Sequence, residues 1–375
     1  MKVIKLLGLL SLFFSFISTS SYARPLFSVG DDLDILFNGS TALRYDTNIT
    51  RDESDEVEDL LYIISPGLEL NYGKGNANIK SIFGAHFTFY SDESRFDSTR
   101  GFFSTEANYS GSRLELNSLL NFKENEYNSN DANVQGDLIR TRTYDFHVKG
   151  SYDFSEKVDL DSGFIFKRED YRNFEDEFND RNEYTVPFSV YYAYSPKLDL
   201  SLDYRLRRTS ISGDNNRVDN FFGFGARGEF APKLEGKFKA GYQHRNISGD
   251  SNEQQFSVDS ELLWTISPLT EFTLGLNRDF GTSGSGDSTE TTGGDIKLKH
   301  TFSPFVWTEG TIAYTYYDYE GPREDDLFRT GIGVFYLPVN YLQFSLDYNF
   351  LDNDSNLDGS SYRSHIISLT ANVRY

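Results

Sequence analysis

The stretch from His365 to Tyr375 reads H-I-I-S-L-T-A-N-V-R-Y and alternates between apolar and polar side chains. The apolar positions are Ile367, Leu369, Ala371, Val373 and Tyr375, and the polar ones are Ser368, Thr370, Asn372 and Arg374. Because successive side chains of a β-strand point to opposite faces, such a strand has one apolar and one polar face. This pattern is typical of a transmembrane β-barrel, in which one face meets lipid and the other a polar lumen.

The same alternation recurs along nearly the whole chain, in segments of roughly ten to fourteen residues. We expect about 18 strands, at residues 33–46, 60–73, 77–90, 99–110, 113–126, 139–154, 158–171, 182–194, 198–211, 218–230, 234–247, 255–266, 271–280, 292–303, 305–319, 326–337, 340–351 and 362–375. Short gaps rich in Gly, Pro and Ser alternate with longer acidic gaps, as short periplasmic turns and longer extracellular loops do in outer-membrane barrels. The sequence therefore predicts an all-β fold, a single antiparallel transmembrane barrel.

The composition agrees with a barrel. Aromatic residues make up 16% of the 375 residues, with 33 Phe and 25 Tyr, yet the mean hydropathy is −0.51. An aromatic-rich but polar chain fits lipid-facing residues that alternate with lumen-facing ones. The absence of Cys excludes a disulfide or a thiolate metal site, and the formal net charge of −21 makes nucleic acid an unfavourable partner.

The N-terminus predicts export. Lys2 and Lys5 precede an apolar segment at residues 6–17, and the small residues of Ser21-Tyr22-Ala23 follow it. These features indicate a cleaved signal peptide at residues 1–23, because the apolar segment is short for a spanning helix. We expect a short periplasmic leader at 24–32 and the barrel at 33–375. A barrel with a signal peptide is expected in the outer membrane of a Gram-negative bacterium, in contact with lipid and lipopolysaccharide.

The alternation assigns many charged residues to the lumen. Along the strands 198–211, 218–230, 234–247 and 292–303, the expected pore-lining residues are Asp199, Asp203, Arg205, Arg207, Arg227, Lys237, Lys239, Lys297 and Lys299. Further cations that are expected to face the lumen, from other strands, are Arg44, Lys123, Lys149, Lys167 and Arg329. Such residues could select solutes in a pore. They could equally pair across neighbouring strands and stiffen the wall, and the sequence leaves both interpretations open.

Two local features give further expectations. Pro187 lies inside the expected strand 182–194 and lacks a donor for the ladder, so we expect a β-bulge there. The long gaps at 47–59, 127–138 and 172–181 are the candidates for loops that fold inward and constrict the pore. The acids of the first gap could bind a divalent cation or cation-bridged lipopolysaccharide, although a solvated surface loop is the simpler interpretation.

Catalysis finds little support in the sequence. His86 and His147 are expected to face the lumen and the other three histidines to face outward or lie near an interface. No local motif places a nucleophile beside either of them. We therefore expect no enzyme, no catalytic residue, no cofactor and no metal ligand.

The stretch L-R-Y-D-T-N-I-T-R-D (43–52), followed by D-L-L-Y-I-I-S-P-G-L-E-L-N-Y-G (59–73), resembles the opening of the putative β-barrel porin 2 family. Members of this family are often linked with exopolysaccharide gene clusters, including exosortase-type systems. The resemblance implies a conduit that helps polymer cross the outer membrane, with periplasmic polysaccharide-export components as partners. The terminal Tyr375 is similar to the signal that barrel-assembly machinery reads, which implies that machinery as another partner.

The sequence thus predicts a porin-like outer-membrane channel, with exopolysaccharide export as the first hypothesis. A general or solute-specific uptake porin is the alternative within transport. An outer-membrane hydrolase, which would need His86 or His147 beside a Ser or Asp, and a structural or adhesive barrel are the alternatives from other classes.

Overall fold

The computed structural model describes residues 25–128, 134 and 136–375. The expected signal peptide at 1–23 lies outside the described residues, as do the start of the leader and residues 129–133 and 135 of the third long gap. None of the helical turns among the described residues is long and apolar enough to cross a membrane.

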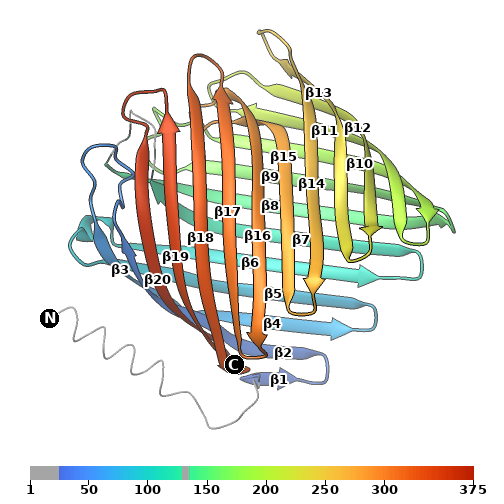
Figure 1. Cartoon of the computed structure of the whole chain (residues 1–375), viewed down its shortest axis with the longest axis horizontal. Helices are drawn as coiled ribbons and strands as arrows, with labels where there is room; N and C mark the ends of the chain where they lie inside the picture. The colour runs from blue at the N-terminus through green and yellow to red at the C-terminus, as the bar shows by residue number, and fades with distance from the viewer. Residues whose placement is uncertain (1–24, 129–133, 135) are drawn as a thin grey trace.

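The described residues form one antiparallel β-sheet that closes into a barrel (Figure 1). Its N-terminal strands are β1 (Phe27–Val29), β2 (Leu33–Asp46), β3 (Asp59–Ser65), β4 (Gly67–Lys74), β5 (Ala77–Tyr90), β6 (Ser98–Ser110), β7 (Leu114–Asn128), β8 (Leu138–Ser155), β9 (Val158–Tyr171) and β10 (Arg181–Ser195). The C-terminal strands are β11 (Leu198–Ile211), β12 (Arg217–Ala231), β13 (Leu234–Ile247), β14 (Glu253–Ser267), β15 (Thr270–Thr282), β16 (Ser288–Ser303), β17 (Val306–Tyr319), β18 (Glu324–Val339), β19 (Leu342–Ser355) and β20 (Tyr362–Arg374).

Eighteen of these segments span the wall, because β3 and β4 form one strand interrupted at Pro66 and β1 is only three residues long. The barrel closes where β2 pairs with β20, from Asn38↔Arg374 to Asp46↔Ile366. In Figure 1 the longer loops gather along the upper and left sides, and the short turns along the lower and right sides. The prediction of a closed antiparallel barrel of about 18 strands is confirmed.

The strand ends follow the sequence pattern closely, with two kinds of difference. Several strands run past their predicted ends, most clearly β16, which begins at Ser288 rather than at residue 292, and β19, which continues to Ser355. Polar residues there extend the ladder beyond the alternating stretch, since Ser288 pairs with Thr282 and Ser355 with Asp325. Backbone pairing needs no apolar side chain, so alternation underestimates these ends.

The first barrel hairpin, formed by β2 with β3 and β4, has two features that the alternation of apolar and polar residues does not predict. Pro66 interrupts the strand without changing its register on β5, and a Cβ added at Gly84 would lie 2.4 Å from the Pro66 carbonyl oxygen. Near the N-terminus, β1 pairs with β2 from Phe27↔Ile35 to Val29↔Leu33, on the edge that β20 leaves uncovered. The expected leader thus contains a strand that protects this edge.

The prediction of a β-bulge at Pro187 is wrong. Pairing with β11 is continuous through Pro187↔Arg205. On the other side the pairs Thr185↔Ile165 and Phe188↔Ser162 keep one register, and only the two positions between them are unpaired. The strand therefore tolerates the missing N–H as a local gap in the ladder to β9 rather than by inserting a residue.

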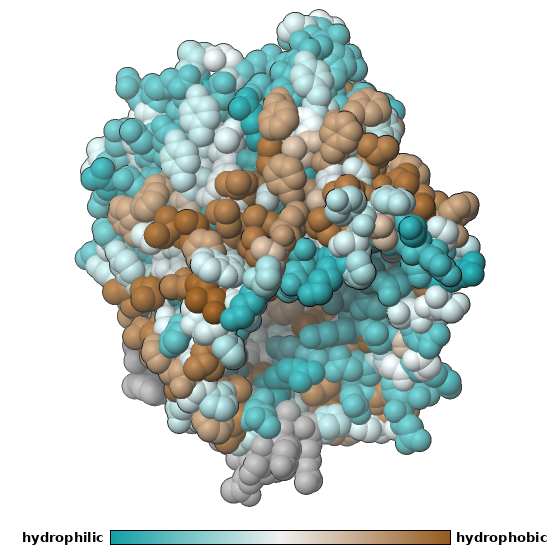
Figure 2. All heavy atoms as spheres, turned by 45° about the vertical axis from the view of Figure 1, so that its right-hand side comes forward, coloured by the Kyte–Doolittle hydropathy of each residue, from teal (hydrophilic) through white to brown (hydrophobic). Residues whose placement is uncertain are grey.

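The outer face of the wall is apolar and the inner face polar. Leu202, Phe222 and Phe224 are among the exposed apolar side chains, whereas Asp203 and Arg207 on the alternate positions of β11 are buried inside. Figure 2 shows a band of hydrophobic residues across the outer surface, with hydrophilic residues above it and lining the hollow below. Lipid can cover such a band, and a register slip of one residue would turn charged side chains toward it.

Candidate functional site in the barrel interior

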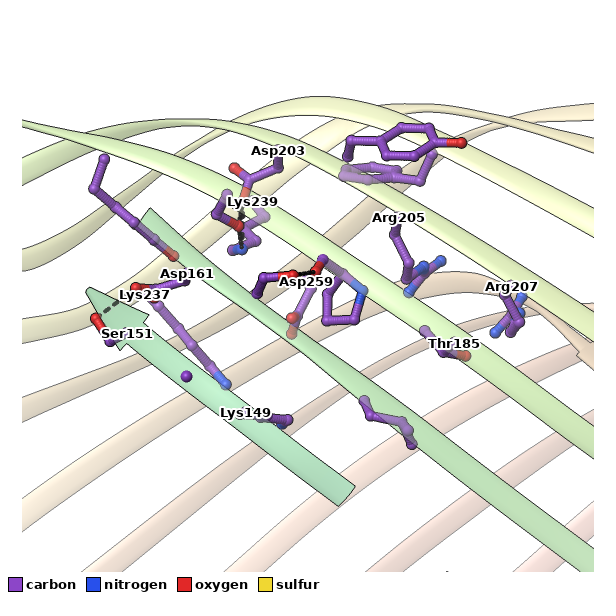
Figure 3. Close-up of a pocket in the computed structure, with 18 of the residues that line it drawn as sticks. Lys149, Ser151, Asp161, Thr185, Asp203, Arg205, Arg207, Lys237, Lys239 and Asp259 are labelled. Carbon is purple, nitrogen blue, oxygen red and sulfur yellow. Dashed lines mark hydrogen bonds and ion pairs between the residues drawn. The ribbon is translucent and has the colours of Figure 1, made fainter. Parts of the chain in front are cut away.

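The interior beside β7 to β14 contains a cavity of about 570 Å³ with charged side chains on its walls (Figure 3). Five of the cations expected to face the lumen lie here: Lys149, Arg205, Arg207, Lys237 and Lys239. Asp203 of the same set also lines this cavity, and its carboxylate pairs with the ammonium group of Lys239 and accepts a hydrogen bond from Ser201 Oγ at 2.6 Å. We call this space the first cavity.

Arg227 forms the densest ion-pair cluster near the first cavity. Its guanidinium lies 2.8 Å from Asp159, 3.0 Å from Asp161 and 3.0 Å from Asp199. The same group stacks over the Tyr191 ring, 3.7 Å from its centroid. Two of these carboxylates come from β9, three strands away, so the side chain extends along the inner wall rather than into the open lumen.

A second cluster joins β11 to strands further around the wall. Arg207 lies 2.6 Å from Asp219 and 3.2 Å from Asp279, and Arg205 lies 2.9 Å from Asp279. Arg245 holds the other oxygen of Asp219 at 2.6 Å. Asp219 and Arg245 are each 1% exposed. A fully paired network of this kind fixes the geometry of the wall, because each charge would be costly without its partners.

Two lysines of the first cavity, Lys149 and Lys237, form no ion pair within 4.0 Å among residues 25–128, 134 and 136–375. The carboxylates of Glu183 and Asp259 line the same cavity and are equally without an ion-pair partner in that part of the chain. In the first cavity, the two lysines without an ion pair are therefore matched in number by two carboxylates without an ion pair.

A second cavity, of about 560 Å³, lies beside β16 to β20 and β2. Lys297 lines it and pairs with Asp295 at 3.4 Å, whereas Lys299, on the same strand, faces Glu309 across the ladder with no ion pair within 4.0 Å among the described residues. The expected pore-lining residues are thus divided: seven lie on β11 to β13 and two on β16. Arg44 and Arg329 also line the second cavity.

The extracellular end of the interior is partly filled by the first loop, residues 47–58. Asn48, Ile49 and Thr50 are almost fully buried, and Ile49 packs against Leu61 and Tyr90. The Asn48 side chain donates to the carbonyl oxygens of Asp52 and Arg363, at 2.7 and 3.0 Å. The first of the three candidate constriction loops therefore folds inward and is anchored to β20.

The loop at residues 283–287, which no sequence pattern singles out, reaches across the same end. Asn179 of the fourth loop (172–180) donates from its backbone N–H to the Gly284 carbonyl at 2.9 Å and from its side chain to Ser285 at 2.6 Å. Because β10 and β16 are six strands apart in the sheet, this contact bridges the barrel mouth.

The hairpin that carries this loop leaves the wall and bends inward. β14 pairs with β15 only from Val258↔Arg278, so residues 279–282 of β15 pair with β16 alone. Interior arginines contact the carbonyl oxygens of this free edge: Arg207 donates to Phe280 at 2.8 Å, and Arg245 to Gly281 at 2.7 Å. Arg181 contacts Thr282 in the same way. The arginines thereby satisfy backbone groups that a neighbouring strand would otherwise satisfy.

Acidic residues in the first loop and at the start of β3 use their carboxylates within the fold. Asp59 accepts hydrogen bonds from the backbone N–H groups of Leu60, Ser91 and Glu93. Hydrogen bonds from the N–H groups of Asp55 and Ser54 hold the pKa of Asp52 below its usual value. Nowhere in the part of the chain that the structure describes do three or more His, Asp or Glu side chains converge as metal ligands would.

The histidines lie on the faces that the alternation predicts. His86 stacks on Phe102, 4.6 Å between ring centroids, and its Nδ1 is 2.7 Å from Ser65 Oγ. No described carboxylate hydrogen-bonds to this ring, so the contact lacks the third group of a catalytic triad. Tyr375 closes the barrel, since its backbone N–H donates to Phe37 at 2.8 Å and its ring lies against Tyr341.

This fold and charged interior define the class: a porin-like β-barrel of the outer-membrane type. The model of the family described as putative beta-barrel porin 2 matches residues 219–375, less than half of the chain. The resemblance is thereby confirmed, although the match covers β12 to β20 rather than the first hairpin. No curated protein matches the chain by sequence.

Solved porins of Pseudomonas aeruginosa share the fold. OpdK is 11% identical with a TM-score of 0.51, over 91% of this chain and 99% of that one. OpdQ is 10% identical with a TM-score of 0.52, over 92% and 100%. OccK2 (OpdF), solved in complex with glucuronate, is 9% identical with a TM-score of 0.50, over 92% and 98%. At these identities the similarity concerns the fold alone.

Proposed function

We propose that the protein is a passive channel of the outer membrane that admits small polar solutes selectively. The observation that supports this most strongly is the position of the loops at the mouth, where the first loop is anchored to β20 and the fourth loop contacts the 283–287 loop. The inner wall below carries cavities of about 570 and 560 Å³. Spaces of a few hundred Å³ are the size of small-molecule sites. A conduit for polymer would instead need a wide lumen, which an 18-stranded barrel provides only when its loops stay out of the way.

Uptake of small solutes therefore accounts for the interior better than export of polysaccharide. The structural relatives are porins, and one of them, OccK2, forms a complex with glucuronate, a small sugar acid. Nothing in these relatives supports exopolysaccharide export, which rested on the resemblance alone. The charged walls give the channel a means of selection, since fixed charges at close quarters discriminate among ions and polar solutes.

We propose that the protein lies in the outer membrane. The apolar outer band fits contact with lipid and lipopolysaccharide, and residues 1–23 would direct export before their removal. Barrel-assembly machinery would then insert the chain.

Single-channel recording of the refolded protein in a planar bilayer tests the function. We expect small, steady conductance that sugars of one or two units reduce and that an anionic polysaccharide leaves unchanged. A large conductance blocked by the polysaccharide would restore the export hypothesis. A complete lack of conductance, together with no swelling of solute-loaded liposomes, would instead favour a structural or adhesive barrel.

A further inference from the structure

The second cavity differs from the first in having cations without matching acids. Three cations, Arg44, Lys297 and Arg329, line it, and Asp295 is the one acid among its described lining residues. Lys297 and Asp295 pair with each other at 3.4 Å. Two guanidinium groups therefore remain, and neither forms an ion pair within 4.0 Å in the described ranges 25–128, 134 and 136–375.

The acids that could neutralise these arginines are already engaged. Asp46 lies on the lumen face of β2, two residues from Arg44, but it holds Arg51 at 2.9 Å and accepts from Ser364 Oγ at 2.6 Å. Asp325 lies on the same face of β18 as Arg329, but it pairs with Arg323 at 2.7 Å. Both arginines are exposed to the cavity, so their donors are available to a solute.

The rest of the lining leaves room beside these groups. Arg329 faces Ala313 on one neighbouring strand and Leu351 on the other. The next row, in which Gly331 has no side chain, brings Ile366 next to Asn349. Two guanidinium groups thus border a space walled partly by Ala, Leu and Ile side chains.

We propose that the second cavity is a binding site for a small organic anion with one oxoanion group and a compact apolar body. Arg44 or Arg329 holds the oxoanion, because a guanidinium offers paired donors that match a carboxylate or phosphate. The two residues lie three strands apart on the wall of the cavity, on β2 and β18. Leu351 and Ile366 contact the body of the ligand. The inference deepens the proposed channel function, on which its physiological sense rests, by naming the class of solute that the channel would retain.

Binding to the detergent-solubilised full-length protein, measured by isothermal titration calorimetry, tests the site without requiring conduction. The probes are butyrate, its neutral isostere butyramide, and inorganic phosphate. We expect butyrate to bind and butyramide not to bind. Phosphate should bind more weakly than butyrate, because it lacks the apolar body. Phosphate binding as tight as butyrate binding would overturn the organic part of the proposal.

Matched double variants locate the binding. R44Q/R329Q should weaken butyrate binding by about tenfold or more, since no guanidinium then remains among the described lining residues of this cavity to hold the oxoanion. The control K149Q/K237Q removes two unpaired cations from the first cavity and should change it by less than about twofold. R329K keeps the charge but not the paired donors, so partial loss is expected. None of the four side chains forms an ion pair with a described residue, so folding should survive, as heat-modifiable migration on gels would verify.

Equal weakening in both double variants would show a diffuse field rather than a site and would overturn the proposal, as would the absence of butyrate binding to the unchanged protein. The binding site and the channel function can fail separately. If butyrate binding depends on Arg44 and Arg329 but the protein conducts no ions, the site is supported and the proposed channel function is rejected.

Discussion

The two cavities of the barrel interior are lined by the same kinds of residue, but they differ in whether their arginines form ion pairs. Around the first cavity, Arg205, Arg207, Arg227 and Lys239 each lie within reach of a carboxylate. Around the second, Arg44 and Arg329 face the lumen while the nearby acids bind other groups. Alternation therefore decides which face a charge occupies, whereas the three-dimensional closure decides whether that charge stabilises the wall or stays available to a solute.

The largest effect is expected where the paired charges are buried. D219N should destabilise the barrel by about 3–5 kcal/mol, because Arg207 and Arg245 would lose the carboxylate that they share. Urea unfolding in lipid vesicles measures the change. The control D259N removes a first-cavity carboxylate that has no described ion pair and should cost less than about 1 kcal/mol. Equal costs would show that pairing contributes nothing special to this wall.

The inward hairpin should have the next largest effect, on conductance. Replacing residues 283–287 by a two-residue Asn-Gly turn should raise single-channel conductance about twofold or more, because the loop bridges the mouth. Residues 248–252 form a loop of similar length at the same end of the barrel, and shortening them in the same way is the control. If the two deletions act alike, the 283–287 loop is not the constriction.

A smaller effect, on ion selectivity, is expected when the ion pairs of Arg227 are removed. R227Q would release Asp159, Asp161 and Asp199, so the permeability ratio of potassium to chloride should rise by about twofold. The reversal potential in a salt gradient reports this ratio. R227K keeps the charge and should shift the ratio less. A ratio that R227Q leaves unchanged would mean that these acids do not face the permeating ions.

The smallest effect concerns pH at the first loop. The pKa of Asp52 is lowered by hydrogen bonds from backbone N–H groups, so its contribution to loop stability is present at neutral pH and is lost as pH falls through that lowered value. Channel noise should therefore stay constant from pH 7 down to the ordinary Asp range, about 4, and increase only below it. D52N should show the increased noise at every pH. Noise that changes near neutral pH would point to another group.

Much of the fold could be predicted because lipid imposes a period of two on every strand. The ranges 33–46, 77–90 and 158–171 were predicted to the residue, and His86 and His147 face the lumen as expected. Alternation could not reveal that Asp279 of β15 would meet Arg207 of β11, since that contact depends on the hairpin bending inward. It also gave no sign that Pro187 would be accommodated without a bulge.

For the candidate site, the sequence predicts which side chains face the lumen but not which of them lie together. Lys297 and Arg205 were expected to line one pore, but they lie in separate cavities with different neighbours. Only the structure shows that Asp46 and Asp325 pair with other arginines, which leaves Arg44 and Arg329 without an ion pair among the described residues. Loop residues 283–287 carry no apolar pattern at all, and their position follows from hydrogen bonds to Asn179 and Arg181 that link distant parts of the chain.

The central claim is that a small-solute channel is narrowed by the 283–287 loop lying against the fourth loop. A disulfide tests it directly, because the chain has no Cys of its own. The variant N179C/S285C would join the two loops where they already touch, and its single-channel conductance can be recorded before and after addition of a reductant. The account predicts that the oxidised variant conducts like the unchanged protein and that reduction alters the conductance little. A conductance that is far lower when the disulfide is closed, and returns to the unchanged level on reduction, would show that the loop does not normally lie across the mouth.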